Sequence, residues 1–383
     1  MKIGVNARFL TKPFTGVGRY TRYLFEELAG QNPQDEFLLV TNLPVDLQMP
    51  RNVKIFVLPE RLPGTSGMKK TYWEQVQVPA FFNKQNIDLA HFPYPCNPWK
   101  AFSKPVAVTV HDCIPWTLSP YRRQISTRLY QDRCQNAVKK ADHVFSVSDA
   151  ARKEVVDVCG LDPAVTSVSY NALPEIFSRK VSPADRLKVL EKYDINPDKP
   201  YFFYVGGFDV RKNVEILVEA YREYIAPDCE IDLVMAGGKH LHDRIYNSFD
   251  ILTKLADGDS LQAEKGQIRA TGFVADEDLP ALYQSSFAFV NLSAKEGFNL
   301  PLLEALVSGI PVVTSDNPVH REVAGNHAVF CRAEMKEAGE ILKKLFIDKD
   351  FYQKQKQKAE DFRCPFSWQK TAAAVMGVYR TLL

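Results

Sequence analysis

Residues 287–316, which read FAFVNLSAKEGFNLPLLEALVSGIPVVTSD, constrain the fold of this chain more than any other stretch. They open with a short run of aromatic and β-branched residues, 287–292, which is typical of a buried parallel strand. Leucines then recur at helical spacing as far as Val307, and Gly309 is placed to end a helix. A proline blocks further helix, and a second apolar run follows at 312–314. This order predicts a strand–helix–strand unit in a parallel α/β sheet.

Two glutamates in this stretch suggest a ligand site. Glu296 falls in the loop at the carboxyl end of the first strand, where open parallel sheets bind ligands, and Glu304 is expected in the first turn of the helix, facing the same crevice. A carboxylate would repel a phosphate there, so neutral sugar hydroxyls are the better partners, although Glu304 alone would also suit the helix dipole. Backbone N–H groups at the helix start favour a phosphate or a polyhydroxyl group. They belong to Gly297, Phe298, Asn299 and Leu300.

The order of residue types is more specific than a strand and a helix. Glu296-Gly-Phe is followed by a small polar residue, Leu-Pro, a spacer, Leu and Glu304-Ala, and then by Ser-Gly-x-Pro-Val-Val. This pattern resembles the signature of the retaining family 4 (group 1) glycosyltransferases. The resemblance implies the GT-B fold, an α/β architecture of two Rossmann-like, doubly wound domains facing an interdomain cleft. It also implies that Glu296 holds the donor sugar and Glu304 the nucleotide ribose.

The rest of the chain alternates strands and helices, as doubly wound sheets require. We expect an acceptor-binding domain over 1–175, a polar linker with prolines over 176–200 and a nucleotide-sugar-binding domain over 201–365. Residues 366–383 resemble the terminal helix that crosses back to the first domain in GT-B proteins. The predicted strands are 2–6, 37–41, 53–58, 89–92, 106–110, 143–147, 165–169, 201–205, 231–236, 268–271, 287–292, 312–314 and 328–330. The predicted helices of the first domain lie near 19–28, 71–83, 122–139 and 150–158.

Two segments of the first domain carry candidate site residues. Gly16 and Gly18 lie in a turn before a helix, but Thr21 stands where a dinucleotide fingerprint needs a third glycine. By resemblance, this turn covers the donor phosphates and the acceptor. His111, at the end of strand 106–110, would by itself be read as a structural histidine. Its Thr-Val-His-Asp-x-Ile-Pro segment looks like that of bacterial polysaccharide mannosyltransferases, in which the histidine contacts the donor sugar.

The second domain carries two adjacent cations. Arg211 and Lys212 stand in front of a predicted helix, after a turn that contains Gly206 and Gly207. Two cations near a helix N-terminus are unfavourable unless an anion lies between them. By resemblance, they hold the donor pyrophosphate and stabilise the leaving nucleotide. Some relatives have arginine where this chain has Gly207, so the arginine role is assigned to Arg211.

The base of the nucleotide is expected against Phe273 and Val274. In the family, this segment meets the base mostly through backbone atoms, so the sequence encodes the identity of the base poorly. Our first interpretation of the donor is GDP-mannose, because the segments that contain His111 and Ser148 resemble those of bacterial polysaccharide mannosyltransferases. UDP-linked sugars remain an alternative.

Two Asp-x-Asp sequences, 257–259 and 276–278, have the spacing that metal-dependent glycosyltransferases of another fold use. The first lies in a polar turn without a preceding buried strand, and the second starts a helix with Asp276 as its cap. We interpret both as structural, and we expect no metal and no cofactor besides the nucleotide-sugar co-substrate. The seven cysteines are scattered without a zinc-ribbon or redox spacing, which indicates reduced thiols.

Composition and charge restrict the cellular location and the kinds of binding partner that we expect for this chain. The apolar runs are too short to span a membrane and the N-terminus lacks a signal-peptide pattern, so a cytoplasmic location is expected. A net charge of +2 does not suit a nucleic-acid binder. Residues 1–175 nevertheless carry 21 Lys and Arg against 16 Asp and Glu. This excess could meet an anionic lipid-linked acceptor or the inner face of the cell membrane, or could simply be a solvated surface.

The resemblance implies a retaining hexosyltransferase, and the interpretation of both Asp-x-Asp sequences as structural makes it metal-independent. It would move a sugar to a saccharide or lipid-linked acceptor in polysaccharide or lipopolysaccharide biosynthesis. Our first interpretation of the sugar and its donor is mannose from GDP-mannose. The predicted catalytic residues are His111, Arg211, Lys212 and Glu296. The alternatives are a UDP-sugar-dependent transferase, a sugar-nucleotide epimerase, an α-glucan phosphorylase with pyridoxal phosphate on a lysine, and a nucleotide-sugar-binding protein without turnover. Donor hydrolysis in the absence of acceptor would separate an enzyme from a binder.

Overall fold

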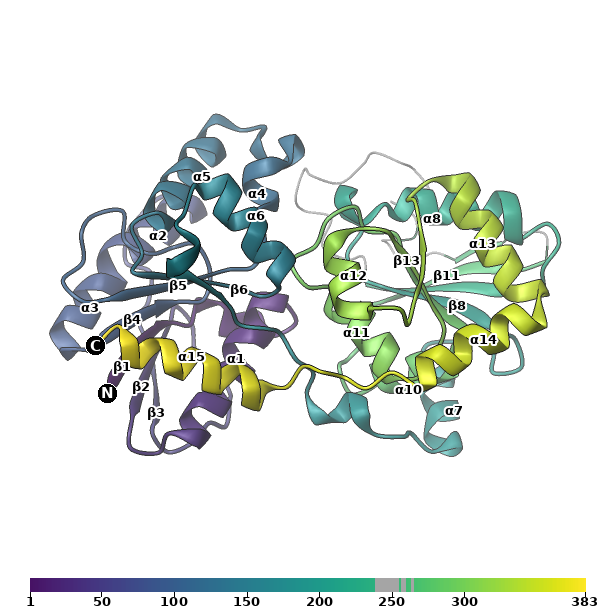
Figure 1. Ribbon diagram of the computed structural model, residues 1–383, viewed down its shortest axis with the longest axis horizontal. Coiled ribbons are helices and arrows are strands. Elements are labelled where there is room, and N and C mark those ends of the chain that lie inside the picture. The colour runs from purple at the N-terminus through teal and green to yellow at the C-terminus, as the bar shows by residue number, and fades with distance from the viewer. Residues whose placement is uncertain (238–254, 256–259, 263–264) are drawn as a thin grey trace. The chain divides into compact units, whose positions relative to one another are not determined.

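The computed structural model describes residues 1–237, 255, 260–262 and 265–383 (Figure 1). The chain divides into two compact units. Unit 1 consists of Met1–Ala172 together with Phe366–Leu383, and unit 2 consists of Leu173–Pro365. Each unit is built on a seven-stranded sheet. The predicted architecture of two Rossmann-like α/β domains is confirmed.

The sheet of unit 1 has the strand order β3-β2-β1-β4-β5-β6-β7, and all of its pairings are parallel. The order reverses between β1 and β4, and open α/β sheets commonly bind ligands at the carboxyl ends of the strands at such a reversal. Its strands are β1 (Lys2–Asn6), β2 (Glu36–Thr41), β3 (Val53–Val57), β4 (Leu89–Phe92), β5 (Val106–Val110), β6 (His143–Ser146) and β7 (Thr166–Val168). Its helices are α1 (Gly16–Gln31), α2 (Ser66–Tyr72), α3 (Val78–Gln85), α4 (Ile114–Thr117), α5 (Ile125–Val138), α6 (Asp149–Cys159) and α15 (Trp368–Thr381).

The sheet of unit 2 has the order β10-β11-β9-β8-β12-β13-β14, with the reversal between β8 and β12. Only β10 is antiparallel among these described strands. Its strands are β8 (Tyr201–Val205), β9 (Asp232–Ala236), β10 (Ser260–Gln262), β11 (Gln267–Gly272), β12 (Ala288–Asn291), β13 (Val312–Ser315) and β14 (Val329–Cys331). Its helices are α7 (Pro183–Lys192), α8 (Val214–Ala220), α10 (Leu279–Ser285), α11 (Leu300–Val307), α12 (Pro318–Ala324), α13 (Met335–Ile347) and α14 (Lys349–Glu360).

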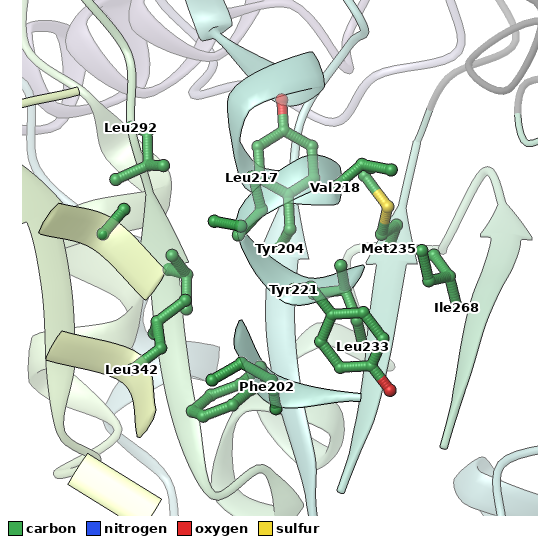
Figure 2. Packing of buried hydrophobic residues seen from close by; sticks show 14 of the residues in the cluster. Phe202, Tyr204, Leu217, Val218, Tyr221, Leu233, Met235, Ile268, Leu292 and Leu342 are labelled. Carbon is green, nitrogen blue, oxygen red and sulfur yellow. The ribbon is translucent and has the colours of Figure 1, made fainter. Parts of the chain in front are cut away.

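Unit 2 is held together by apolar side chains between its sheet and the helices that cover it (Figure 2). Large aromatic residues from β8 and from the turn after α8 are fully buried there, among them Phe202, Tyr204 and Tyr221. Full burial of one such side chain contributes about 1.5–3 kcal/mol. A rigid core of this kind fixes the ends of β8 and β12, from which the site loops extend.

Two predicted helices have different limits in the structure. The helix expected near 71–83 begins earlier, at Ser66, because the Thr65 side chain accepts a hydrogen bond from the Met68 N–H at 3.4 Å and caps it. It continues through a wider turn, η2 (Trp73–Gln77), into α3. The helix expected over 122–139 begins at Ile125, after a separate 3₁₀ turn, η3 (Ser119–Arg122).

The segment 176–200, expected to link the two domains, lies within unit 2. Helix α7 packs against α10. Lys192 Nζ and the Tyr193 hydroxyl donate to Asp278 Oδ2 at 2.7 and 2.8 Å. Asp278, rather than the expected Asp276, is the residue that precedes α10. Polar contacts of this kind lie outside hydrophobic periodicity, which is why the sequence indicated a linker.

Neither metal nor membrane features stand out in the described part of the chain. No group of three or more His, Cys, Asp or Glu residues among the described positions could hold a metal ion. Asp257 and Asp259 lie outside the described residues. None of the described helices is long and apolar enough to cross a membrane.

The core of unit 1 contains a polar chain that reaches helix α15. His91, on β4, contacts the Thr109 hydroxyl through Nε2 at 2.8 Å and the Tyr379 hydroxyl through Nδ1. The Tyr20 hydroxyl lies 3.1 Å from Thr109 Oγ1 and 2.8 Å from the Ser169 hydroxyl. All five side chains are buried. Since each of these polar groups has a partner, hydrogen bonds offset the cost of burying them and connect α15 to the sheet.

The buried His91 and the partly buried His111 predict a pH-dependent stability of unit 1. Burial lowers the pKa of His91 to about 3 and that of His111 to about 4, whereas an unfolded histidine titrates near pH 6.5. Between these pH values the unfolded state binds protons that the folded state does not. The free energy of unfolding is therefore highest above about pH 6.5 and decreases as the pH falls below that value. Each such histidine contributes a slope of up to about 1.4 kcal/mol per pH unit.

Urea unfolding at pH 7 and pH 5 tests this expectation, because few carboxylates titrate in that window. All four tryptophans belong to unit 1, so tryptophan fluorescence follows that unit. We expect lower stability at pH 5 and a shallower pH slope for His91→Gln. Equal stability of the parent protein at the two pH values would contradict it.

Candidate active site

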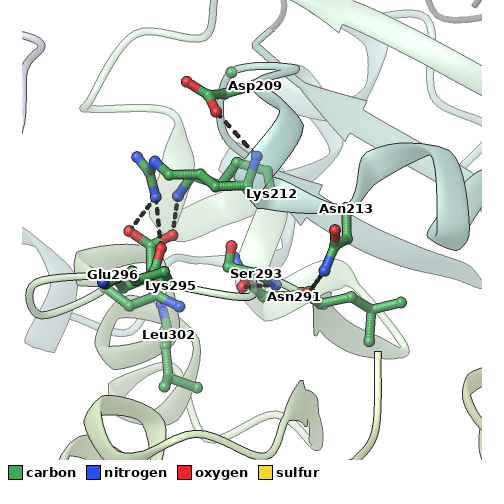
Figure 3. A network of polar contacts seen from close by, with 12 residues as sticks. Asp209, Lys212, Asn213, Asn291, Ser293, Lys295, Glu296 and Leu302 are labelled. Carbon is green, nitrogen blue, oxygen red and sulfur yellow. Dashed lines mark hydrogen bonds and ion pairs between the residues drawn. The ribbon is translucent and has the colours of Figure 1, made fainter. Parts of the chain in front are cut away.

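The loops that follow β8 and β12 meet at the carboxyl edge of the unit 2 sheet (Figure 3). The two strands pair directly, and therefore deliver their next loops to the same place. The Arg211 carbonyl, in the short turn η6 (Val210–Lys212), accepts a hydrogen bond of 2.8 Å from the Ala294 N–H. The Arg211 guanidinium donates to the Lys295 carbonyl at 3.0 Å. These bonds fix the cationic turn against the loop that carries Glu296.

Glu296 pairs with two cations, Arg211 and Lys212, the second of which is labelled in Figure 3. Arg211 Nη1 is 2.6 Å from Glu296 Oε2, and Lys212 Nζ contacts Oε1. The exposed fractions of the side chains are 20% for Arg211, 11% for Lys212 and 8% for Glu296. Because water is largely excluded, these charges interact more strongly than a surface pair would. The structure thus brings together three of the four residues predicted to be catalytic.

Neighbouring charges set the pKa values of this cluster, and a hydrogen bond shapes the turn that carries its cations. Burial by itself would raise the pKa of Glu296, but the charges of Arg211 and Lys212 and the Lys212 hydrogen bond lower this pKa to about 2. Burial lowers the pKa of the Lys212 ammonium, an effect that Glu296 opposes. Asp209 Oδ1 accepts from the Arg211 N–H at 3.0 Å and shapes the turn. In this cluster, two cations therefore share one buried carboxylate, which stays ionised.

The start of helix α11 is set by an asparagine and a histidine. Asn299 has a left-handed backbone with φ of 69°, and its side chain accepts from the Leu302 N–H at 3.4 Å. Its amide Nδ2 lies 2.8 Å from His320 Nε2. His320 Nδ1 faces the Ser315 carbonyl at 2.9 Å, so the proton belongs on Nδ1 and Nε2 accepts from Asn299.

Sequence reasoning missed His320. It is fully buried, and burial lowers its pKa, so the imidazole stays neutral and keeps Asn299 in one orientation. A signal was present in the sequence. His320 follows the strand β13, and Glu296 follows the neighbouring strand β12, so both polar residues are delivered to the same sheet edge.

Glu304 does not lie where the sequence indicated. Helix α11 begins at Leu300 and has no acidic residue in its first turn, so Glu304 lies in the second turn. The dipole effect has declined there, and the interpretation of Glu304 as a simple dipole partner is wrong. The Glu304 side chain is fully buried, and its Oε2 accepts a hydrogen bond of 2.9 Å from the Tyr283 hydroxyl.

The remaining donor-site candidates of unit 2 lie in loops at the same sheet edge. Gly206 has a φ of 151°, and a Cβ there would lie 2.9 Å from the Tyr204 hydroxyl, which donates to the Gly207 carbonyl at 2.8 Å. Phe273, after β11, is 61% exposed, whereas Val274 is buried. The backbone donors predicted before α11 belong to buried residues, namely Gly297, Phe298, Asn299 and Leu300.

In unit 1, the glycine turn and His111 follow β1 and β5. A Cβ on Gly18 would lie 2.4 Å from the Lys12 carbonyl oxygen, so the close approach of α1 requires glycine there, whereas a Cβ on Gly16 would meet nothing within 4 Å. His111 Nε2 lies 3.0 Å from the Pro93 carbonyl. With a neutral ring, this nitrogen carries the proton, and Nδ1 is left as an acceptor. The Tyr20 ring packs edge-on against His111, with 4.9 Å between centroids.

Two family models match consecutive parts of the chain. Residues 14–174 match the model of Glycosyltransferase Family 4, and residues 185–362 match the model of Glycosyl transferases group 1. The chain belongs to the group 1 glycosyltransferases. Among curated relatives of this glycosyltransferase is the O-antigen chain mannosyltransferase B of Escherichia coli, which is 27% identical over 343 residues covering 85% of each chain.

Solved structures show the same fold. WaaG, a glycosyltransferase involved in lipopolysaccharide biosynthesis, is similar with a TM-score of 0.72 and 14% identity over 99% of each chain. HepE from Anabaena in complex with UDP and glucose is similar with a TM-score of 0.71 and 16% identity over 99% of each chain. The GT-B fold of this group 1 glycosyltransferase, predicted from its sequence signature, is confirmed. The roles of the individual site residues stay predictions.

Proposed function

We propose that this group 1 glycosyltransferase moves a hexose from a nucleotide-diphospho-sugar to a saccharide acceptor in polysaccharide biosynthesis, with retention of the anomeric configuration. The observation that supports this proposal most is the pair of cations, the buried Lys212 and the partly buried Arg211, that share Glu296. A protein that only bound a sugar would not need two cations arranged in this way. A leaving diphosphate does, because negative charge increases on it as the glycosidic bond breaks.

In the proposed reaction, the bond from the anomeric carbon to the β-phosphate oxygen breaks, and the acceptor hydroxyl oxygen bonds to the same face of that carbon. The departing phosphate takes the hydroxyl proton. Lys212 and Arg211 offset the charge of the leaving group, and Glu296 turns toward the donor sugar. Diphosphate oxygens would then replace the Glu296 carboxylate as partners of the two cations. The positive charges that stabilise the transition state would thus be in place before the donor binds.

For the donor we propose GDP-mannose. The support is the similarity to a mannosyltransferase of Escherichia coli and the His111 segment. UDP-linked sugars are the second candidate, since the structural neighbour HepE was solved with UDP and glucose and the expected base contacts use backbone atoms. Phe273, more than half exposed, offers a ring face to either base.

A thermal-shift comparison of nucleotides tests the donor. GDP and GDP-mannose at a hundred times their dissociation constants are expected to stabilise the protein by about 2.7 kcal/mol, and UDP and UDP-glucose at the same concentrations much less. A shift with UDP alone would transfer the proposal to UDP-sugars. No shift with any of the four would contradict nucleotide-sugar binding altogether.

Metal removal is expected to leave the activity unchanged. Arg211 and Lys212 can neutralise the diphosphate that a divalent ion neutralises in metal-dependent transferases. The measurement is sugar transfer, or donor hydrolysis without acceptor, in excess EDTA. Complete loss that Mn²⁺ or Mg²⁺ restores would contradict this expectation and would make Asp257 and Asp259 the next residues to change.

A further inference from the structure

Unit 1 contains a large cavity whose lining includes none of the predicted site residues. Its volume is about 1010 Å³, at the upper end of what small-molecule sites show. It lies among α2, η2, α3 and α5, of which α2, α3 and α5 are labelled in Figure 1. Apolar and aromatic side chains make up much of its wall, including Leu62, Met68, Val76, Ala80, Trp99 and Tyr130. Such a wall suits a hydrocarbon ligand.

Large apolar side chains are exposed around this cavity. Met68 and Val76 line it and are 54% and 46% exposed. Ile125 and Leu129, one helical turn apart on α5, are 75% and 56% exposed, and the residues between and after them, such as Tyr130, line the cavity. Clustered exposure of this kind marks an interaction site, whereas single exposed apolar residues are ordinary.

A second cavity of about 690 Å³ adjoins the first and has a different character. Four cations contribute to its wall, Arg8, Lys12, Lys69 and Lys70, together with one carboxylate, Glu60. Arg8 pairs with Glu60, so the lysines supply the excess positive charge. Lys70 lines both cavities. An apolar chamber and a cationic chamber therefore meet at one lysine.

Lys70 is held at this junction by a buried carboxylate. Its Nζ lies 3.7 Å from Glu74 Oε1 and 5.0 Å from the centre of the Tyr130 ring. Glu74 is fully buried and accepts hydrogen bonds from the Tyr94 hydroxyl at 2.8 Å and the Tyr130 hydroxyl at 2.7 Å. With its carboxylate already satisfied by two hydroxyls, Glu74 leaves the Lys70 ammonium with donors for an anion in the cationic chamber.

We propose that the two chambers together bind one amphiphilic lipid phosphate, with its hydrocarbon chain in the 1010 Å³ cavity and its phosphate in the 690 Å³ cavity. The occupant is the lipid carrier of the acceptor saccharide, an inference that depends on the proposed sugar transfer. The cationic chamber includes Thr11 and Lys12, just before the turn with Gly16 and Gly18. A saccharide attached to the phosphate would thus start beside the turn assigned to the acceptor.

Single-chain alkyl phosphates below their micelle concentration are the probes, and fluorescence of Trp99 in the cavity wall reports their binding. Affinity is expected to rise about fourfold for each added methylene, the change that corresponds to about 0.8 kcal/mol, and to level off once the chamber is full. An alkyl alcohol of the same length is expected to bind at least tenfold more weakly. Equal binding of alcohol and phosphate would overturn the assignment of the cationic chamber.

Two variants with matched controls locate the site. Val76→Glu and Lys69→Glu are expected to weaken alkyl phosphate binding at least tenfold, whereas Leu187→Glu and Lys188→Glu, on α7 of unit 2, leave it unchanged. Leu187 matches Val76 because both are 46% exposed, so neither substitution should disturb the core. Loss of binding in the controls, or its retention in both cavity variants, would contradict the proposal.

A membrane surface is the competing explanation of the same chemistry. Binding to vesicles of anionic phospholipid without any binding of monomeric alkyl phosphate would overturn the single-ligand proposal. These assays contain no nucleotide sugar, so they are independent of catalysis. Donor hydrolysis that persists while alkyl phosphate fails to bind would leave the proposed sugar transfer intact and this inference wrong.

Discussion

Lys212→Met is expected to lower kcat for sugar transfer by about 10²–10³-fold, the cost of removing one charge-stabilising donor from a preorganised site. The Lys212 ammonium is largely shielded from water and contacts Glu296, so a charge there acts on the leaving diphosphate through little solvent. Steady-state kinetics with saturating donor measures the effect. A kcat within threefold of the parent value would contradict the role assigned to Lys212.

Two measurements show whether a lower kcat of Lys212→Met reflects lost catalysis rather than a general effect of the substitution or a loss of folding. Lys188→Met removes an exposed lysine that pairs with Asp185 on α7 and is expected to leave kcat unchanged. Urea unfolding shows whether Lys212→Met still folds, because removing one partner of a buried pair can cost about 3–5 kcal/mol. Arg211 still pairs with Glu296 in this variant, so the carboxylate is not left alone.

The second large effect separates Glu296 from Glu304. If Glu296 binds the sugar more strongly as positive charge develops on the ring, Glu296→Gln is expected to lower kcat by about 10²-fold or more. Its affinity for the free nucleoside diphosphate should stay the same or increase, because Glu296 competes with phosphate for Arg211 and Lys212. Calorimetry with the free diphosphate measures that affinity.

Glu304→Gln is expected to act on binding instead. If Glu304 holds the ribose before and after the transition state, its loss should weaken donor and free nucleotide by about 1.5–3 kcal/mol and raise KM. Tyr283→Phe is the control, since it removes the hydroxyl that donates to Glu304 and leaves the carboxylate in place. If the two glutamate variants lose nucleotide affinity equally, or both turn over like the parent, the division of roles is wrong.

Much of the unit 2 site could be predicted because one rule governs it. Loops that follow neighbouring parallel strands meet at one edge of the sheet, and the hydrophobic runs of β8 and β12 are plain in the sequence. Glu296, Arg211 and Lys212 each follow such a run closely, so their contact was within reach of sequence reasoning. The family signature supplied what spacing could not, namely the roles expected of them.

The parts that escaped prediction depend on side-chain contacts between distant residues. His320 orients Asn299 across 21 positions, and Asn299 adopts a left-handed backbone that shifts the start of α11 and so the place of Glu304. The bonds from Lys192 and Tyr193 to Asp278 that attach α7 to unit 2 span 86 and 85 positions. Neither hydrophobic periodicity nor capping preference carries such information, because both describe only a few residues at a time.

Helix α15 completes unit 1 from the far end of the chain. The contact between His91 and Tyr379 joins residues 288 positions apart, and all of unit 2 lies between them in sequence. On the ribosome, unit 2 is therefore fully synthesised before unit 1 has all of its core. Unit 2 can fold as one continuous segment, whereas unit 1 is completed only after unit 2 has been synthesised, because the phenol partner of His91 belongs to α15.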